Sequence, residues 1–217
     1  MPKPVLVIAN KRYSSWSLRP WIAMKASGIP FEEKQIFLRK PDSYKKLDKV
    51  SPGGKVPVLI DGKNTVWESL AILEYLAEKF PKKNLWPKDS SARTWARSIS
   101  NEMHGGFTAL RTHCNMNCVK LIKGFMVPDG ALKDAARVEA IWNTTRKKFA
   151  KKGPFLFGSF TNADAMYAPV VTRFKTYGLP ANTVSRAYME VILELPAMKE
   201  WIHAAKQETE IIPDYEK

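Results

Sequence analysis

The chain has 217 residues, of which 45% are hydrophobic and 26% charged, a composition typical of a globular protein and not of a disordered or fibrous one. This length is sufficient for one large domain or two smaller ones with real cores. The net charge of +14 attracts anions of every kind, but neither zinc-finger spacing nor an aromatic RNA-binding signature accompanies it, so nucleic acid is not the expected partner.

The first 80 residues predict a small mixed sheet covered by helices. A continuous apolar run predicts a buried strand over 5–9, and helical spacing predicts a helix over 17–27 that a Gly-Ile-Pro sequence ends. The order β-α-β followed by β-β-α is the layout of a thioredoxin-like domain. The later elements expected here are a strand over 31–37, a short helix or loop over 41–49, a hairpin with Asp61-Gly62 at its turn, and a helix over 69–80.

The rest of the chain predicts helices. Residues 81–89 contain prolines and lysines without periodicity and are interpreted as a linker. The predicted fold is therefore α/β plus all-α: a thioredoxin-like domain over 1–80, the linker 81–89, and an all-helical domain over 90–217. Its helices are expected over 90–124, with a kink at Gly105-Gly106, and over 131–152, 162–177, 182–194 and 196–208.

The first apolar run, Val5 to Asn10, is too short for a signal peptide's core or a membrane span, so we expect a cytoplasmic protein that does not enter membranes. Cys114 and Cys118 cannot form a disulfide framework, and no matching histidine pair suggests zinc. We expect two reduced thiols near a core and no metal, with a redox pair as the lesser alternative. The densest basic cluster, Lys147 to Lys152, is interpreted as a solvated helix end.

Three serines, Ser14, Ser15 and Ser17, lie between the first strand and the first helix. A helix start offers free N–H groups and partial positive charge, and a hydroxyl there can donate to a bound thiolate and so lower the thiol pKa. The alternative is that one serine only caps the helix, and the stretch taken alone fits that alternative better. Arg19, one turn further, is a candidate for holding this loop or an acidic ligand, and a surface role explains it equally well.

Two further segments offer groups to a peptide-like ligand. If the Val56–Pro57 bond is cis, Val56 presents its own N–H and C=O to an added strand, although the frequency of about 5% for cis X–Pro bonds argues for trans. Glu68 and Ser69 open a helix, where Ser69 is a candidate N-cap and Glu68 a candidate partner for an ammonium group. A plainly capped helix explains this pair equally well.

A fourth segment has a structural interpretation alone. Thr161 and Asp164 have capping-box spacing, with aspartate where glutamate or glutamine is usual, and Phe160 precedes them as a hydrophobic staple. This segment predicts the start of a buried helix.

Together these segments resemble the cytosolic glutathione transferases, and the resemblance covers essentially the whole chain. Ser14 to Arg19 is similar to the Ser-Ser-Cys-Ser-x-Arg segment of the zeta class, with Trp16 in place of cysteine. The other matches are Lys55 to Leu59 with the family's cis-proline motif, Glu68 to Ile72 with its motif for the γ-glutamyl end of glutathione, and Gly158 to Asp164 with the C-terminal capping box.

The resemblance implies a glutathione site in the first domain, with glutathione as co-substrate. By residue match, Ser14 or Ser15 polarises the sulfur, and Tyr13 stays open because some classes use a tyrosine. The remaining implied contacts are Val56, ahead of Pro57, with the cysteinyl backbone, Glu68 and Ser69 with the γ-glutamyl group, and Lys55 or Lys40 with the glycyl carboxylate.

A second substrate is expected between the domains, against residues 95–117, where an apolar wall is formed by Trp95, Met103, Phe107 and Met116. Its predicted pocket comprises Trp16, His104, Phe107 and Arg111. A lone histidine on a helix is more often structural than catalytic, which makes His104 the weakest candidate, whereas Arg111 suits an acidic substrate. Because Trp16 replaces a thiol, mixed-disulfide chemistry at that position is not expected.

The leading interpretation is a detoxifying enzyme that ionises the glutathione thiol and directs it at a small electrophile or a peroxide, with glutathione-dependent isomerisation as a subsidiary form. One alternative is a non-catalytic module of the same fold in a protein or RNA assembly, which the net charge of +14 would suit. Another is a ligand-carrying or stress protein. The intact serine, Val-Pro and Glu-Ser segments favour the enzyme, and the resemblance implies a homodimer.

Overall fold

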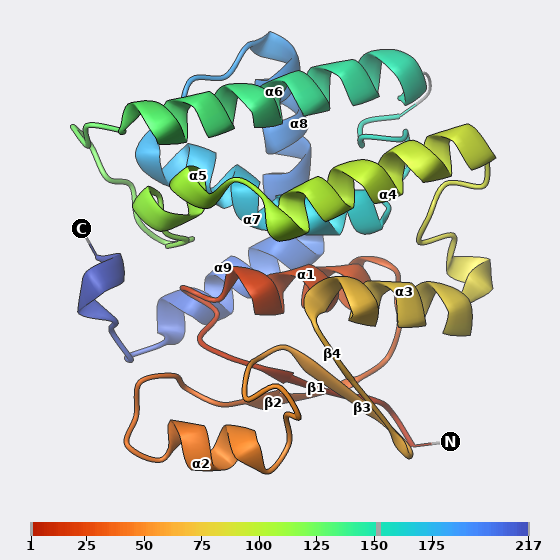
Figure 1. Ribbon diagram of the computed structural model, residues 1–217, viewed down its shortest axis with the longest axis vertical. Helices are drawn as coiled ribbons and strands as arrows, with labels where there is room; N and C mark the ends of the chain where they lie inside the picture. The colour runs from red at the N-terminus through yellow and green to blue at the C-terminus, as the bar shows by residue number, and fades with distance from the viewer. Residues whose placement is uncertain (1, 151–152, 217) are drawn as a thin grey trace.

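The computed structural model describes residues 2–150 and 153–216 and places a four-stranded sheet at one end and a group of helices at the other (Figure 1). The first part contains β1 (Val5–Ile8), α1 (Ser15–Ala26), β2 (Glu32–Gln35), α2 (Ser43–Asp48), β3 (Val58–Asp61), β4 (Asn64–Trp67) and α3 (Ser69–Lys79). The second contains the 3₁₀ turn η1 (Pro81–Lys83), α4 (Ser90–Gly105), α5 (Thr108–His113), α6 (Asp129–Phe149), α7 (Asn162–Tyr177), α8 (Thr183–Glu194), α9 (Pro196–Gln207) and the 3₁₀ turn η2 (Pro213–Tyr215).

The sheet confirms the predicted thioredoxin-like layout. Its strand order is β2-β1-β3-β4, with β1 parallel to β2 and antiparallel to β3. Because side chains alternate across a strand, Leu6 and Ile8 face α1 and α3, whereas Val7 faces the opposite side with Leu47 of α2. The sheet is therefore covered by helices on both faces, with α2 on the outer one (Figure 1).

One buried cluster joins the sheet region to the helices. Trp21 of α1 packs edge-on against Trp201 of α9, with ring centroids 5.0 Å apart. Trp142 of α6 packs against Phe174 of α7 at 5.0 Å. Helix α1 also packs along α7. This continuous core fixes the loop between β1 and α1 against the helical part of the molecule.

The predicted capping box at the start of α7 is present. Asp164 is fully buried and accepts hydrogen bonds from the backbone N–H of Thr161 at 2.8 Å and of Leu156 at 3.0 Å. Burial raises the pKa of Asp164 to about 6, against the effect of these hydrogen bonds, which lower it. The box anchors α7, which carries Arg173 into the centre of the molecule.

The predicted single helix over 90–124 is wrong. Helix α4 ends at Gly105, the short α5 ends at His113, and residues 114–128 are irregular. The break is built by Gly106, where an added Cβ would lie 2.6 Å from the carbonyl oxygen of Glu102, and by Phe107, whose φ of 58° is left-handed. The two glycines therefore end the helix instead of kinking it.

The cysteines consequently do not share a helix face. Cys114 follows the last residue of α5 and Cys118 lies in the irregular segment. Both are free and buried, as expected for reduced thiols near a core. Burial raises the pKa of Cys114 to about 11 and that of Cys118 to about 12, so neither is ionised at neutral pH.

The remaining differences concern helix ends. Helix α1 begins at Ser15, so Ser15 and Ser17 lie inside it, and only Ser14 precedes it. Helix α3 has Glu68 at its N-cap and Ser69 as its first residue, which corrects the assignment of Ser69 as the cap. The predicted end of the helix over 131–152 and the basic residues there fall partly outside the described residues. Within 2–150 and 153–216, every helix is too short or too polar to cross a bilayer.

Candidate functional site

A cavity of about 500 Å³ lies where the sheet region meets the helices. This volume is in the range of pockets that hold small ligands, roughly 300–1,000 Å³. The loop before α1, the segment before β3, helices α5 and α7, and the C-terminal segment all contribute to its wall. Its lining includes these predicted site residues: Tyr13, Ser14, Ser15, Trp16, Lys55, Val56 and Arg111.

Other predicted residues lie beside this lining. Ser69 is buried, and its hydroxyl accepts a hydrogen bond from Arg19 Nη1 at 3.2 Å. Glu68 is exposed, with its carboxylate 3.7 Å from His104 Nε2. Burial, and then the charge of Arg19, lowers the pKa of His104. Ser69, Glu68 and His104 are thus linked to the cavity through Arg19 and its neighbours.

Three more residues complete the predicted set. Lys40 forms an ion pair with Glu210, and Phe107 is buried in the core at the start of α5. Pro57 is buried, and the Val56–Pro57 peptide bond is cis, as the family pattern implies. Of the apolar wall expected along residues 95–117, Met116 is the member that reaches the cavity.

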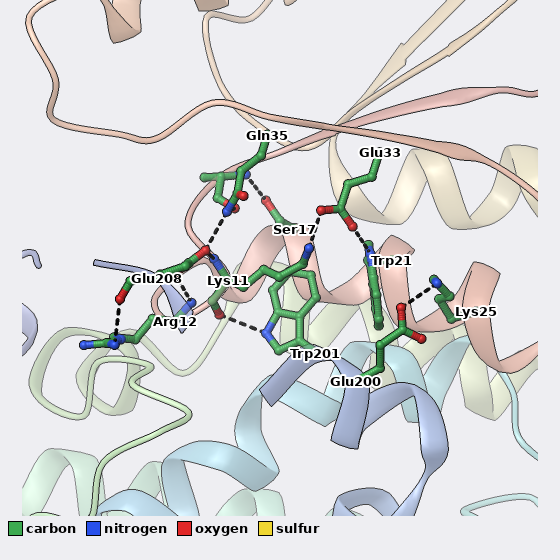
Figure 2. Close-up of polar contacts among 11 residues, drawn as sticks. Lys11, Arg12, Ser17, Trp21, Lys25, Glu33, Gln35, Glu200, Trp201 and Glu208 are labelled. Atoms are coloured by element: carbon green, nitrogen blue, oxygen red, sulfur yellow. Dashed lines mark hydrogen bonds and ion pairs between the residues drawn. The ribbon is translucent and has the colours of Figure 1, made fainter. Parts of the chain in front are cut away.

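Ser14 is the N-cap of α1 and is linked to a second buried hydroxyl (Figure 2 shows Ser17). Ser14 Oγ accepts from the backbone N–H of Ser17 at 3.3 Å and donates to Ser17 Oγ at 2.8 Å. Ser17 Oγ in turn accepts from the backbone N–H of Ala9 at 3.1 Å. A hydroxyl proton rotates freely, so when Ser14 donates into the cavity, Ser17 can donate to Ser14 instead.

Ser15 has a different partner. Arg173 of α7 is buried, and its Nη2 donates to Ser15 Oγ at 3.2 Å while its Nη1 donates to the carbonyl oxygen of Cys114. Burial, and then the nearby charge of Arg111, lowers the pKa of Arg173 to about 10, which leaves it charged at neutral pH. Arg173 was not predicted from the sequence, and the available signal was a cation, one of two with Lys175, on a helix whose other residues are almost all buried.

The indole of Trp16 lies close to two guanidinium groups. Arg19 Cζ is 4.2 Å and Arg111 Cζ is 4.8 Å from the centroid of the Trp16 ring, within the range of cation–π attraction. Arg111 Nη1 also donates to the carbonyl oxygens of His104 at 3.2 Å and Gly106 at 3.1 Å. The break between α4 and α5 therefore supplies the acceptors that aim Arg111.

The three arginines form a cationic wall, a name used below for Arg19, Arg111 and Arg173 with the Trp16 ring. Burial, and then the charges of Arg111 and Arg173, lowers the pKa of Arg19 to about 9. Among the described residues, Arg19 Nε is buried without a hydrogen-bond partner. Mutual repulsion and incomplete pairing of buried cations favour an anion in the space that Arg111 and Arg173 line.

The hydroxyl of Tyr13 is already engaged. Tyr13 is buried and donates to Glu216 Oε1 at 2.5 Å. Burial, and then this hydrogen bond, raises the pKa of Tyr13. Its single proton is thus directed at a carboxylate from the C-terminal segment.

Two more lining residues were missed by the sequence analysis. Asn10 Oδ1 accepts from the backbone N–H of Leu38 at 2.9 Å, while Asn10 Nδ2 is buried and unpaired within the described part of the chain. Arg39 lines the cavity from the loop after β2, with a left-handed φ of 60°. Both follow strand ends, where a sequence signal is indistinguishable from that of an ordinary loop.

The architecture is a thioredoxin-like mixed sheet joined to a helical region, with a serine-bearing helix start where the two meet. Comparisons with known proteins assign this architecture to a class. The family model described as "Glutathione S-transferase, N-terminal domain" matches residues 13–79. A probable maleylacetoacetate isomerase of Caenorhabditis elegans is 30% identical over 203 residues, which cover 90% of this chain and 91% of the relative. A zeta-class glutathione S-transferase of Euphorbia esula is 36% identical over 118 residues, covering 54% of this chain and 52% of the relative.

Solved structures agree with these relatives. A sphingomonad glutathione S-transferase complexed with glutathione is 25% identical, with a TM-score of 0.66 over 94% of this chain and 100% of that one. A Burkholderia glutathione transferase homologue with bound glutathione shares the fold, with 21% identity and a TM-score of 0.73 over 94% and 99% of the two chains. The chain therefore belongs to the glutathione S-transferase family, a family of enzymes.

Proposed function

We propose that this transferase binds glutathione in the cavity beside α1, activates its thiol with Ser14, and directs the thiolate at a small electrophile that carries an acidic group. The observation that carries the proposal is the Ser14–Ser17–Ala9 hydrogen-bond chain at the start of α1, facing a cavity of about 500 Å³. This arrangement supports transfer chemistry over a binding module, because a module needs no such polarised hydroxyl.

Glutathione supplies the thiol, and the chain supplies the means to ionise it. When the Ser14 hydroxyl donates to the sulfur, Ser17 donates to Ser14 and is itself polarised by the Ala9 N–H. The hydrogen bond and the partial positive charge at the start of α1 both favour the thiolate over the thiol, so the thiol pKa falls from about 8.5. Ser14 is the better donor because it is half-buried, whereas Ser15 is buried and held by Arg173.

The rest of the tripeptide is assigned by residue match. Val56 pairs with the cysteinyl backbone, in a segment fixed by Ser51, whose hydroxyl donates to the carbonyl oxygen of Lys55 at 2.6 Å and accepts its N–H at 3.0 Å. Glu68 and Ser69 hold the γ-glutamyl group. Lys55 or Lys40 receives the glycyl carboxylate. Residues 1–80 thus serve as the glutathione-binding domain, 81–89 as a linker and 90–217 as the second-substrate domain.

The cationic wall selects the second substrate. Arg111 and Arg173 both line the cavity, and a carboxylate placed between them would relieve the repulsion between their charges. An acidic alkene whose double bond is conjugated to a carbonyl group is one such electrophile. The thiolate adds to the double bond and the carbonyl takes the electron pair as an enolate; rotation about the new single bond and return of the electron pair then expel the same thiolate, so the alkene is isomerised without consuming glutathione. The wall and the isomerase relative favour this reaction as a second candidate.

The test is a titration of the purified protein with reduced glutathione by calorimetry, followed by turnover assays with matched electrophiles that do or do not carry a carboxylate. We expect binding in the micromolar to millimolar range and a preference of at least about tenfold in kcat/KM for the acidic member. Glutathione binding without turnover of any electrophile, peroxide or acidic alkene would favour the binding module.

We also infer from the family that the protein acts as a cytoplasmic homodimer in detoxification. The family relationship supports this inference. Sedimentation equilibrium at micromolar concentration tests the dimer, and a monomer mass would overturn it.

A further inference from the structure

The chain beyond α9 contributes to the wall of the cavity. Residues 208–216, called the strap below, leave the end of α9 and reach η2 on the side of the molecule where α5 lies (Figure 1). The strap contains four carboxylates, those of Glu208, Glu210, Asp214 and Glu216, in a chain with a net charge of +14. Three of these carboxylates pair with cations, Glu210 with Lys40, Asp214 with Arg39 and Glu216 with Lys120, and such cations also suit an anionic ligand.

The root of the strap is Glu208, shown in Figure 2 between Gln35, Lys11 and Arg12. Its Oε1 accepts from the backbone N–H of Lys11 at 2.6 Å and from Gln35 Nε2 at 2.5 Å. Its Oε2 accepts from the backbone N–H of Arg12 at 3.0 Å. These contacts fix the strap to the loop that leads into Ser14.

The tip of the strap is Glu216. It accepts from Tyr13 Oη at 2.5 Å and from Asn117 Nδ2 at 2.9 Å, and it pairs with Lys120 at 3.2 Å. Burial raises the pKa of Glu216, but the hydrogen bonds from Tyr13, Lys120 and Asn117 together with the charge of Lys120 outweigh it, so the pKa is lowered. The tip thus joins the loop before α1 to the irregular segment after α5.

The middle of the strap lines the cavity and carries two ion pairs. Ile212 and Tyr215 are part of the cavity wall. Glu210 pairs with Lys40, and Asp214 pairs with Arg39 at 2.6 Å. Lys40 is a residue that the family match assigns to the glycyl carboxylate of glutathione, and Arg39 lines the cavity beside it. Both pairs are exposed to solvent, so they are weaker than the contacts at the root and tip.

We propose that the strap is an autoinhibitory closure whose middle carboxylates compete with glutathione. Glu210 holds Lys40, one of the two lysines that the family match offers to the glycyl carboxylate, and Asp214 holds Arg39 in the cavity wall. We expect the tripeptide to displace the middle of the strap when it takes these cations, while the root and tip remain attached. This proposal rests on the proposed glutathione site. It makes residues 208–216 a determinant of glutathione affinity although they lie at the far end of the chain from the serine motif.

The test compares the double variant Glu210→Gln/Asp214→Asn with a matched control, Glu194→Gln/Glu200→Gln. The control removes the same charge from two exposed ion pairs, with Lys199 and Lys25, away from the cavity. Calorimetry with reduced glutathione should give a Kd about threefold to tenfold lower for the strap variant, since each exposed pair changes an equilibrium by up to about fivefold. The control should bind like the wild type.

Hydrogen–deuterium exchange gives a second measurement on the wild-type protein. Saturating glutathione should raise exchange in residues 209–215. Equal Kd values for the wild type and the strap variant, or lowered exchange on binding, would overturn the competition, and lowered exchange would mean that the strap closes with the ligand. If none of the three proteins binds glutathione, the proposed function itself is overturned, and this proposal with it.

Discussion

The two groups of residues beside the cavity, called the serine end and the cationic wall, differ in charge and in origin. The serine end, comprising Ala9, Ser14 and Ser17, is neutral and comes from nine consecutive residues around the start of α1. The cationic wall is charged and comes from α1, α5 and α7, with Arg173 lying 158 residues from its partner Ser15. The first arrangement is local, whereas the second exists only in the folded chain.

The difference indicates a division of roles. A neutral hydroxyl and a helix start stabilise a thiolate without binding it so tightly that it loses reactivity. The pKa values of the guanidinium groups lie well above neutral pH, so these groups stay charged and do not exchange protons, but they orient an anion well. The serine end should therefore set the rate for every electrophile, and the wall should decide which electrophile is accepted.

Ser14→Ala should have the largest effect. Removing one preorganised donor lowers kcat by about 10²–10³-fold, and the loss should be similar for acidic and neutral electrophiles, with glutathione affinity changed only a few-fold. Thiolate absorbance against pH would show a higher thiol pKa. Ser98→Ala, on an exposed face of α4, is the control. Full turnover in Ser14→Ala with a loss in Ser15→Ala would transfer the role to Ser15.

Arg173→Met should have the next largest effect, and it should distinguish the role of the cationic wall from that of the serine end. Losing a charged hydrogen-bond donor lowers kcat/KM by about 50-fold for an acidic electrophile, but should leave a neutral one within about threefold. Arg173→Lys should restore part of the activity, and Arg186→Met, at an exposed site on α8, serves as the control. Equal losses for both electrophiles would mean that Arg173 acts through Ser15 and not on the substrate.

Ser17→Ala should have a smaller effect, because it removes the residue behind the donor. We expect kcat to fall by about tenfold and the pH profile to shift upward by about one unit as the thiol pKa rises. The shifted profile is the decisive readout, since a purely structural loss would lower activity equally at all pH values. An activity loss that is equal at all pH values would mean that Ser17 has no positioning role.

His104→Gln should change only the pH dependence of stability. The pKa of His104 is below 6.5 in the folded state, so protonation favours the unfolded chain, and the free energy of unfolding falls as the pH drops below 6.5. The variant should lose less stability than the wild type between pH 7.5 and 5.5 in urea titrations. His203→Gln, at an exposed position on α9, is the control. An unchanged slope would mean that neither burial nor the arginines lower the pKa of His104.

Sequence reasoning succeeded where the determinants are close together in the chain. The mixed sheet, the capping box of Thr161 and Asp164, and the buried reduced thiols of Cys114 and Cys118 all appear as expected. Alternation of apolar residues and cap spacing depend on a few neighbouring residues, so no tertiary information is needed.

It failed where burial by distant segments decides. Glycines within a helical pattern are compatible with a helix that continues or with one that ends, and the left-handed backbone of Phe107 ends the helix here. Arg173 resembles any cation on a helix until the packing of α7 against α1 buries it. The acidic C-terminal residues resemble a solvated tail until Lys40, Arg39 and Tyr13 are seen to hold them.

The sequence by itself determined the order of elements, the serines at the start of α1 and the proline before β3, because these depend on backbone preferences and short-range hydrogen bonds. The tertiary structure alone decided which charges meet in the cavity. The reason is physical, because a guanidinium or a carboxylate acquires its partner, its burial and its pKa from segments that lie far away in the sequence. Only the packed core of α1, α7 and α9 brings these segments together.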